Sequence, residues 1–289
     1  MHLLIIVSLI WGFSFVIIKG SLTSLDSSFV SFVRLGLSLL IFVPLLKPAA
    51  TRGREKLQLM LIGGLQFGIM YLAYIAAFGH LPAHLIALLT TTTPIFVSIF
   101  ADILGRRFHR TAFLAAALAV AGGAVLEFPD QPFAASLRGV ILVQVSNASF
   151  ALGQVVYRNW MRARPSLRDS DSFGFLYAGA VVVSGLFFLS TAELVGLSVQ
   201  PHQAMALLYL GLIASGICFF LWNIGARRVG VGSLAIMNNM KIPVAVIASI
   251  TVLGEGTDWP RLIAGWLLMA LALLVNTRDA VGLRLKTDT

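Results

Sequence analysis

Charged residues are scarce in this chain. Asp, Glu, Lys and Arg together make up 11% of its 289 residues, whereas 58% of the residues are hydrophobic. So few polar side chains cannot cover the surface of a soluble globule of this size. The composition therefore excludes a soluble globular protein and indicates an integral membrane protein.

Several chemical signatures are also missing. Cys218 is the only cysteine, so no intramolecular disulfide can form. No Walker A sequence is present, which argues against an ATPase of that type. His80 and His84 have the spacing of helical metal ligands, but Pro82 lies between them and no carboxylate is near. We therefore predict no metal site, no cofactor and no enzymatic activity.

Ten windows of mainly apolar residues are long enough to cross a membrane, for which a helix needs roughly 20 residues. Helices satisfy their own backbone hydrogen bonds in lipid, and the runs lack the two-residue alternation of a membrane β-barrel. We predict an all-α integral membrane protein with ten transmembrane helices. The windows lie near residues 3–20, 28–46, 57–78, 84–104, 111–127, 138–157, 173–192, 204–224, 232–253 and 260–276.

Positive charge is distributed unevenly over the predicted connections. The chain has 21 lysine and arginine residues and a net charge of +9. Most of these residues lie in the even-numbered connections, from Lys47 onward, and in a predicted cytoplasmic tail at residues 277–289. By the positive-inside rule, both termini are cytoplasmic. Topology thus explains the basicity, and we expect no nucleic-acid binding.

Two segments of the chain match without a gap. Pro94–Gly105 (PIFVSIFADILG) and Pro243–Gly254 (PVAVIASITVLG) lie 149 residues apart and both end in Leu-Gly. A second match, between Trp11–Lys19 and Phe150–Arg158, has a spacing of 139 residues. The chain is therefore predicted to be a tandem duplication.

The predicted copies span residues 1–127 and 138–276, with five helices each. Because five is an odd number, the two copies have opposite orientations in the membrane. Inverted repeats that meet at the bilayer midplane are the architecture of many secondary transporters.

Four features carry a resemblance to a known family. They are the run WGFSFVIIK at Trp11–Lys19, Arg34 in the second span, the paired prolines, and Leu-Gly-Glu at Leu253–Glu255. With these features the chain resembles the drug/metabolite transporter superfamily and its ten-helix EamA-type members. The resemblance implies export of small metabolites across a bacterial-type inner membrane. Gly105-Arg106 departs from the Gly-Glu with which the family's first half tends to end its fourth helix.

Pro94 and Pro243 are predicted hinges within their spans. Proline lacks an N–H, so each releases the carbonyl four residues earlier, at Thr90 and Asn239. Such breaks are tolerated in membranes where they face protein or a water-filled cavity. Paired breaks in inverted copies point to a central site. The alternative is a packing kink that a neighbouring threonine hydroxyl repairs.

Lys241 lies in the middle of the ninth span, where the first copy has Thr92. A charge at this depth costs about 2.5–3.5 kcal/mol, so it should face the interior of the bundle. It is predicted to bind a substrate carboxylate or to release a proton during transport. The alternative is a lysine that braces the break at Pro243.

Other polar and aromatic side chains are predicted to line the same site. Each of them alone could be an interhelical hydrogen bond, but together they suit a cavity for amphipathic solutes. The predicted substrate-binding residues besides Lys241 are Asn238, Asn239, Thr92, Tyr74, Gln144, Asn147, Gln154, Trp222 and Asn223. For Arg34, a snorkelling side chain or a structural ion pair competes with substrate contact.

These features predict a secondary transporter that exports small amphipathic metabolites, such as amino acids or related organic acids, by alternating access. Its expected partners are a small-molecule substrate and the lipid bilayer. One alternative is an exporter of lipophilic drugs or lipid-linked sugars, and another is a membrane-embedded lipid-modifying enzyme. Gly64 and Gly68 form a GxxxG motif that could serve a homodimer or packing within one bundle.

Overall fold

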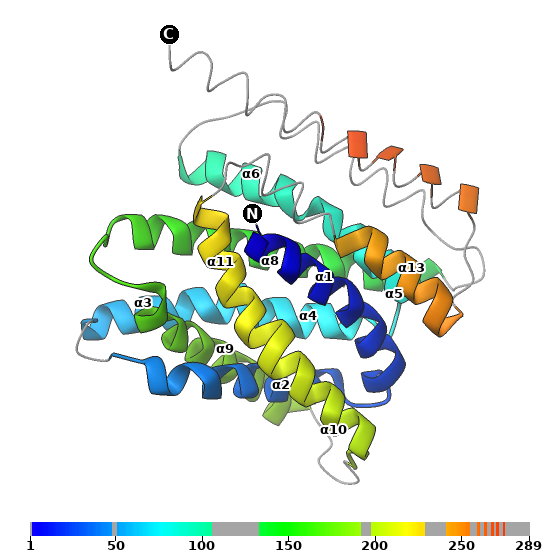
Figure 1. The fold of residues 1–289 in the computed structure, drawn as a ribbon, viewed down its shortest axis with the longest axis horizontal. Coiled ribbons are helices and arrows are strands. Elements are labelled where there is room, and N and C mark those ends of the chain that lie inside the picture. Colours follow the sequence, from blue (N-terminus) through cyan, green and yellow to red (C-terminus); the bar gives the residue numbers. More distant parts are fainter. Residues whose placement is uncertain are drawn as a thin grey trace.

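A computed structural model describes residues 2–47, 51–105, 133–191, 198–228 and 241–254, with short helical pieces between residues 259 and 274. All regular structure in these residues is helical (Figure 1). Seven of the described helices are long and apolar enough to cross a membrane, and a shorter apolar helix covers Val244–Leu253. The chain is therefore a multi-pass membrane protein. The predicted span at 111–127 lies outside the described residues.

The described part of the first half folds into four long helical units, each of which contains a π-helical or 3-10 turn. The helices are α1 (His2–Ile17) with the π-helix η1 (Ile18–Leu22), α2 (Ser27–Phe42) with η2 (Val43–Leu45), α3 (Gly53–Gly63) with the π-helix η4 (Gly64–Ile69) and α4 (Met70–Ala77), and α5 (Ala83–Leu89) with η5 (Thr90–Thr92) and α6 (Thr93–Leu104).

The described part of the second half contains the longest helix. Its elements are α8 (Phe133–Arg162), α9 (Asp169–Thr191), α10 (Pro201–Leu208) with the π-helix η6 (Tyr209–Ile217) and α11 (Cys218–Arg228), and α13 (Lys241–Leu253). Asp169 and Asp171 lie in the first turn of α9, where carboxylates complement the helix dipole.

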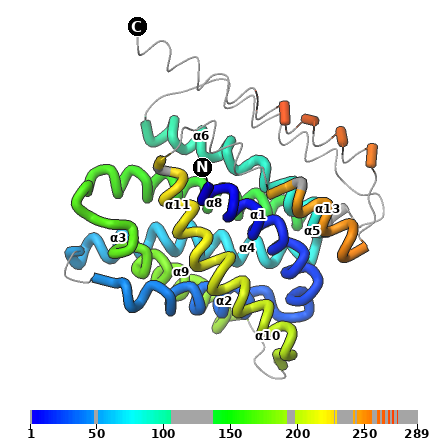
Figure 2. The backbone as a smooth tube through the Cα atoms, in the orientation of Figure 1, coloured from blue at the N-terminus to red at the C-terminus, as the bar shows by residue number. Residues whose placement is uncertain are grey.

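Helices of the two halves pack mainly against each other. α9 packs on α2 and α3, α8 packs on α4 and α6, and α1 packs on α13. Figure 2 shows the resulting bundle, in which α2 and α9 lie together at one side and α6 and α13 at the other. Side chains from both halves can therefore contribute to one site in the interior of the bundle.

The glycines of the GxxxG motif are used inside the bundle. A side chain at Gly64 would collide with Val183 of α9, and one at Gly68 would press on the same residue. A side chain at Gly63 would overlap the backbone of Leu176. Small residues let two helices approach closely. In this fold the motif therefore serves the packing of α3 and η4 on α9, the second of its two predicted uses.

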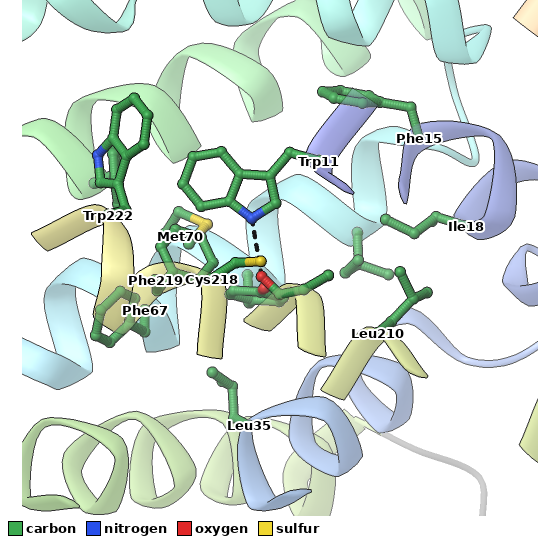
Figure 3. Close-up of a cluster of buried hydrophobic side chains, with 14 of the residues drawn as sticks. Trp11, Phe15, Ile18, Leu35, Phe67, Met70, Leu210, Cys218, Phe219 and Trp222 are labelled. Carbon is green, nitrogen blue, oxygen red and sulfur yellow. Dashed lines mark hydrogen bonds between the residues drawn. The ribbon is translucent and has the colours of Figure 1, made fainter. Parts of the chain in front are cut away.

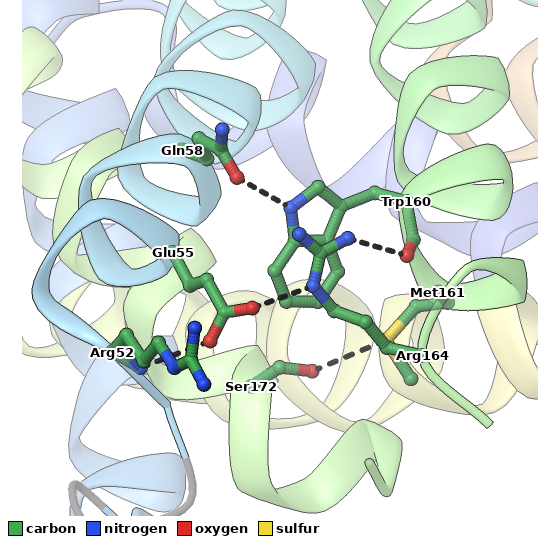
Figure 4. Close-up of polar contacts among 7 residues, drawn as sticks. All are labelled: Arg52, Glu55, Gln58, Trp160, Met161, Arg164 and Ser172. Carbon is green, nitrogen blue, oxygen red and sulfur yellow. Dashed lines mark hydrogen bonds and ion pairs between the residues drawn. The ribbon is translucent and has the colours of Figure 1, made fainter. Parts of the chain in front are cut away.

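One end of the bundle carries polar contacts between the halves (Figure 4). Arg164 Nε of the α8–α9 connection donates to Glu55 Oε1 at 2.8 Å, and its guanidinium lies 4.0 Å from the centre of the Trp160 ring. Trp160 Nε1 donates to Gln58 Oε1 at 2.9 Å. These bonds tie α3 to α8 at the end that is predicted to be cytoplasmic.

Candidate functional site

Helices from both halves line a partly open cavity inside the bundle. Its walls combine aromatic rings, small hydroxyl groups, one amide and two cations. The lining residues are Trp11, Ser14, Phe15, Arg34, Met70, Tyr71, Tyr74, Thr90, Thr93, Ser146, Asn147, Phe150, Ala214, Phe219 and Lys241.

Lys241, the first residue of α13, is one of the two cations. The residue is only 8% exposed. Its Nζ lies 5.4 Å from the centre of the Trp11 ring, within the range of a cation–π interaction. The lysine therefore faces the protein interior, as the cost of a charge in lipid requires.

Arg34 of α2 is the second cation, and it is 2% exposed. Its Nη2 donates to Ser215 Oγ at 3.0 Å and to the Tyr71 hydroxyl at 3.3 Å, and its Cζ lies 4.8 Å from the centre of the Tyr71 ring. No carboxylate of the described residues pairs with it, and its buried Nη1 has no hydrogen-bond partner among them. Arg34 therefore neither snorkels to the surface nor forms an ion pair there.

The π-helix η6 shapes the wall beside Arg34. Ser215 Oγ accepts from the Tyr71 hydroxyl at 2.7 Å and donates to the carbonyl of Leu210. Side chains from other helices donate to carbonyls of η6: Trp11 Nε1 to Ala214 at 2.9 Å (Figure 3) and the Tyr177 hydroxyl to Ser215 at 2.5 Å. Single-turn π-helices often occur at functional sites because they expose such backbone groups.

Three aromatic rings form a continuous strip along the cavity. The ring of Tyr71 lies 6.0 Å from that of Phe219, and the Phe219 ring lies 4.7 Å from that of Trp11. Figure 3 shows Trp11 above Phe219, with Trp222 beside it. We call Tyr71, Phe219 and Trp11 the aromatic strip. It offers an apolar surface to a bound solute.

The break at Pro94 is closed by hydrogen bonds. Thr93 Oγ1 donates to the Thr90 carbonyl at 2.8 Å, the carbonyl that the proline releases. Asn147 Nδ2 donates to the carbonyl of Leu89 and to Thr92 Oγ1, both at 2.9 Å. A threonine hydroxyl thus closes this break. The contact is the one expected for a packing kink, the alternative interpretation of the proline.

The predicted site residues fall into three groups. Lys241, Tyr74 and Asn147 line the cavity. Thr92 and Gln144 lie next to it and bond to each other, with Thr92 Oγ1 donating to Gln144 Oε1 at 2.8 Å. Trp222 packs on Trp11, with 5.0 Å between the ring centres, and does not line the cavity.

The remaining predicted residues lie elsewhere. Gln154 and Asn223 line a separate cavity of about 340 Å³. Asn238 and Asn239 lie outside the described residues, and of Pro243 only the helical backbone is described. The sequence did not single out Phe15 or Phe150 as lining residues, because phenylalanine is equally common on the core-facing and lipid-facing sides of a membrane span.

A multi-pass helical bundle with a polar and aromatic cavity inside it is consistent with a membrane transporter. The sequence model of the EamA-like transporter family matches residues 1–127 and 137–277. The chain belongs to this family, which is part of the drug/metabolite transporter superfamily, and it is a transporter.

Known relatives cover almost the whole chain. A "Probable biotin transporter" of Pseudomonas aeruginosa is 36% identical over 96% of this chain and 97% of its own length. The "Biotin transporter" of Escherichia coli K12 is 33% identical over 96% of this chain and 93% of its own length. A "Probable terminal-alkyne amino-acid exporter" of Streptantibioticus cattleyicolor is 27% identical over 73% of this chain and 69% of its own length.

The fold is shared with a solved structure. One crystal structure of a protein aligns with a TM-score of 0.66 at 16% identity, over 96% of this chain and 97% of that chain.

Proposed function

We propose that this chain is a secondary transporter of small amphipathic carboxylates, with biotin as the foremost candidate. The observation that carries the proposal is the cavity itself, which places a buried lysine beside an aromatic strip. Relatives that are 33–36% identical bear the name of a biotin transporter. The proposal keeps the predicted class of organic acids and narrows it.

The charge of the cavity favours an anion. Arg34 and Lys241 are both among its lining residues, and the lining set contains no Asp or Glu. In a region of low dielectric, the attraction between a cation and a carboxylate is much stronger than in water. A purely cationic drug would be repelled by the same groups.

The apolar walls favour an amphipathic molecule. Biotin has a carboxylate at the end of a short alkyl chain and a fused ring with a urea group at the other end. The alkyl chain can lie on the aromatic strip while the polar groups meet the cations. Amino acids with a large apolar side chain share part of this pattern, and one relative is named as a probable terminal-alkyne amino-acid exporter.

Alternating access is the proposed mechanism, with ten helices in two inverted repeats at 1–127 and 138–276 in a bacterial-type inner membrane. The helix contacts support it, because α1 on α13 and α6 on α8 are equivalent pairs under the duplication. The π-helices η4 and η6 also lie in equivalent spans. Gln66 of η4 and Ser215 of η6 are 149 residues apart, which is the spacing of the repeat. Rocking of the halves, with Pro94 and Pro243 as hinges, would expose the cavity to each side in turn.

The proposal is tested with purified protein in liposomes. Uptake of labelled biotin is measured in both directions, with and without a proton gradient, for wild type and Lys241→Met. A hydrogen bond to a charged group contributes about 1.5–3 kcal/mol, so the variant should lose about 10- to 150-fold in apparent affinity. Lys47→Met is the matched control, because Lys47 lies at the exposed end of the bundle, paired with Asp171 at 3.7 Å.

Two results would refute the proposal. The first is a wild-type protein that moves neither biotin nor other carboxylates. The second is a Lys241→Met variant that transports biotin with wild-type affinity. Competition by amino acids at lower concentration than biotin would instead favour the amino-acid exporter as the second candidate.

A further inference from the structure

We infer that Arg34 binds a second oxygen-bearing end of the substrate, so that the transported acid is elongated, with one acceptor group at each end of an apolar middle. This inference rests on the proposed function and specifies its substrate class. It assigns a role to a residue for which the sequence left three interpretations open.

The first observation is the order of contacts along the aromatic strip. Arg34 Cζ lies 4.8 Å from the centre of the Tyr71 ring, at one end of the strip. Lys241 Nζ lies 5.4 Å from the centre of the Trp11 ring, at the other end. Phe219 lies between the two rings, at 6.0 Å from Tyr71 and 4.7 Å from Trp11. Each end of the apolar strip is therefore occupied by a cation.

The second observation is the incomplete hydrogen bonding of Arg34. Its Nε and Nη2 donate to hydroxyl groups of Ser215 and Tyr71, whereas Nη1 is buried and has no acceptor among the described residues. An unsatisfied buried donor costs about 1–3 kcal/mol, and more when it is charged. Because Arg34 lines the cavity, a ligand oxygen placed there can accept from this nitrogen.

The chemistry of the guanidinium defines what the second end must carry. Its planar N–H groups match a carboxylate, and they also donate to the carbonyl oxygen of a urea or amide. A simple fatty acid has only a methyl group at that end, which would leave Nη1 unsatisfied. The inferred substrate class therefore includes ureido acids such as biotin and dicarboxylates of similar length, and it excludes monocarboxylates that carry no second acceptor group.

Binding measurements with three probes test the inference. Biotin has a carboxylate and a urea, pimelate has two carboxylates, and heptanoate has one carboxylate on a chain of equal length. We expect wild type to bind biotin or pimelate at least about tenfold more tightly than heptanoate, since one hydrogen bond to a charged group contributes about 1.5–3 kcal/mol. Stronger binding of pimelate than of biotin would identify the second end as a carboxylate.

Arg34→Met should abolish this preference by weakening the two-ended probes while heptanoate binding stays unchanged. Arg34→Lys should keep part of the preference, because it retains a charged donor. If Arg34 were only structural, all three probes would weaken together. That uniform loss, or a wild type that binds biotin and heptanoate equally, would overturn the inference and leave the proposed function standing. A wild type that binds none of the probes would instead refute the proposed function.

A second variant covers the case in which Arg34→Met does not fold. Ser215→Ala removes the hydroxyl to which Arg34 donates at 3.0 Å, and Ser215 is not among the residues that line the cavity. The guanidinium stays in place with more of its N–H groups unsatisfied. We expect the preference for two-ended acids to be kept or to increase in this variant. A lost preference would contradict the inference.

Discussion

Helices α6 and α13 carry prolines at equivalent positions, Pro94 and Pro243, but the residues before the two prolines differ in their roles. In the first copy Thr92 bonds to Gln144 and Asn147, and Thr93 repairs the break at Pro94. In the second copy, 149 residues later, the equivalents of these threonines are Lys241 and Ile242. Lys241 lines the cavity, whereas Thr92 lies behind its wall.

The residues before the two prolines differ in chemistry, and this difference indicates different roles for the two segments. Hydrogen bonds saturate the first break and fix it against α8, a role that needs only hydroxyl and amide groups. The second copy supplies a charge that has a cost in the membrane and is expected to have a function. The difference between the two matched segments therefore identifies the residues with which to test the site.

Exchange of the two equivalent residues should have the largest effect. Lys241→Thr restores the sequence symmetry and should reduce biotin transport at least about tenfold, because a hydrogen bond to a charged group contributes about 1.5–3 kcal/mol. Thr92→Lys places a charge behind the cavity wall, at a cost of about 2.5–3.5 kcal/mol. The double exchange should combine both defects, as measured by uptake and by thermal melting in detergent. Restored transport in the double variant would show that the two positions are interchangeable.

Replacement of Asn147 should have an intermediate effect. Its Nδ2 donates to Leu89 and Thr92, and the residue also lines the cavity. Asn147→Leu removes both bonds at a similar volume. Interhelical bonds of this kind average about 0.6 kcal/mol, so we expect a loss of about 1 kcal/mol in stability and a severalfold loss in transport. Ser146→Ala, at a neighbouring lining residue, is the control, and equal losses in both variants would contradict this role of Asn147.

Thr93→Val should have a smaller effect than the loss of Asn147. Valine keeps the shape of threonine but removes the hydroxyl that donates to the Thr90 carbonyl at 2.8 Å. The equivalent residue before Pro243, Ile242, likewise has no hydroxyl. We expect a loss of about 0.6 kcal/mol in the free energy of unfolding, since only one hydrogen bond is removed. An unchanged melting temperature would indicate that the carbonyl finds another donor.

The sequence predicted the helical membrane fold and the burial of Lys241. Both predictions depend on physical rules that hold whatever the tertiary structure is. Long apolar runs form helices in lipid whatever their neighbours are. A lysine in the middle of such a run has to face the interior, and Lys241 does so. Asn147 and Tyr74 were likewise identified from polar groups on otherwise apolar spans, and they line the cavity.

The rest of the lining depends on local helix geometry that a regular period cannot predict. Gln66, Met70 and Tyr74 follow one another at a spacing of four residues, which in a regular α-helix places them on one face. The π-helix η4 covers 64–69 and changes the helical phase there, so that Met70 and Tyr74 line the cavity while Gln66 packs against Gly153. The sequence left the role of Arg34 open among three interpretations, because its partner Ser215 is 181 residues away in the sequence.

The smallest expected effect is a dependence of stability on pH. It arises at His80, in the connection between α4 and α5. Burial and the positive charge of Arg138 lower the pKa of His80, which lies between α4 and α5. The second copy has Val229 at the equivalent position and therefore no titratable group there. Because the unfolded chain binds a proton near pH 6.5 and the folded chain only at lower pH, stability falls as the pH drops below about 6.5.

The measurement is the melting temperature in detergent between about pH 7.5 and pH 5. We expect the decrease to be smaller for His80→Gln than for wild type. It should also be smaller for Arg138→Gln, in which the His80 pKa is less depressed because a repelling charge is gone. The effect is modest because His80 is only partly buried, so that solvent screens the repulsion. Identical pH profiles for all three proteins would show that the acid sensitivity of the bundle arises elsewhere, and would remove this difference between the two copies.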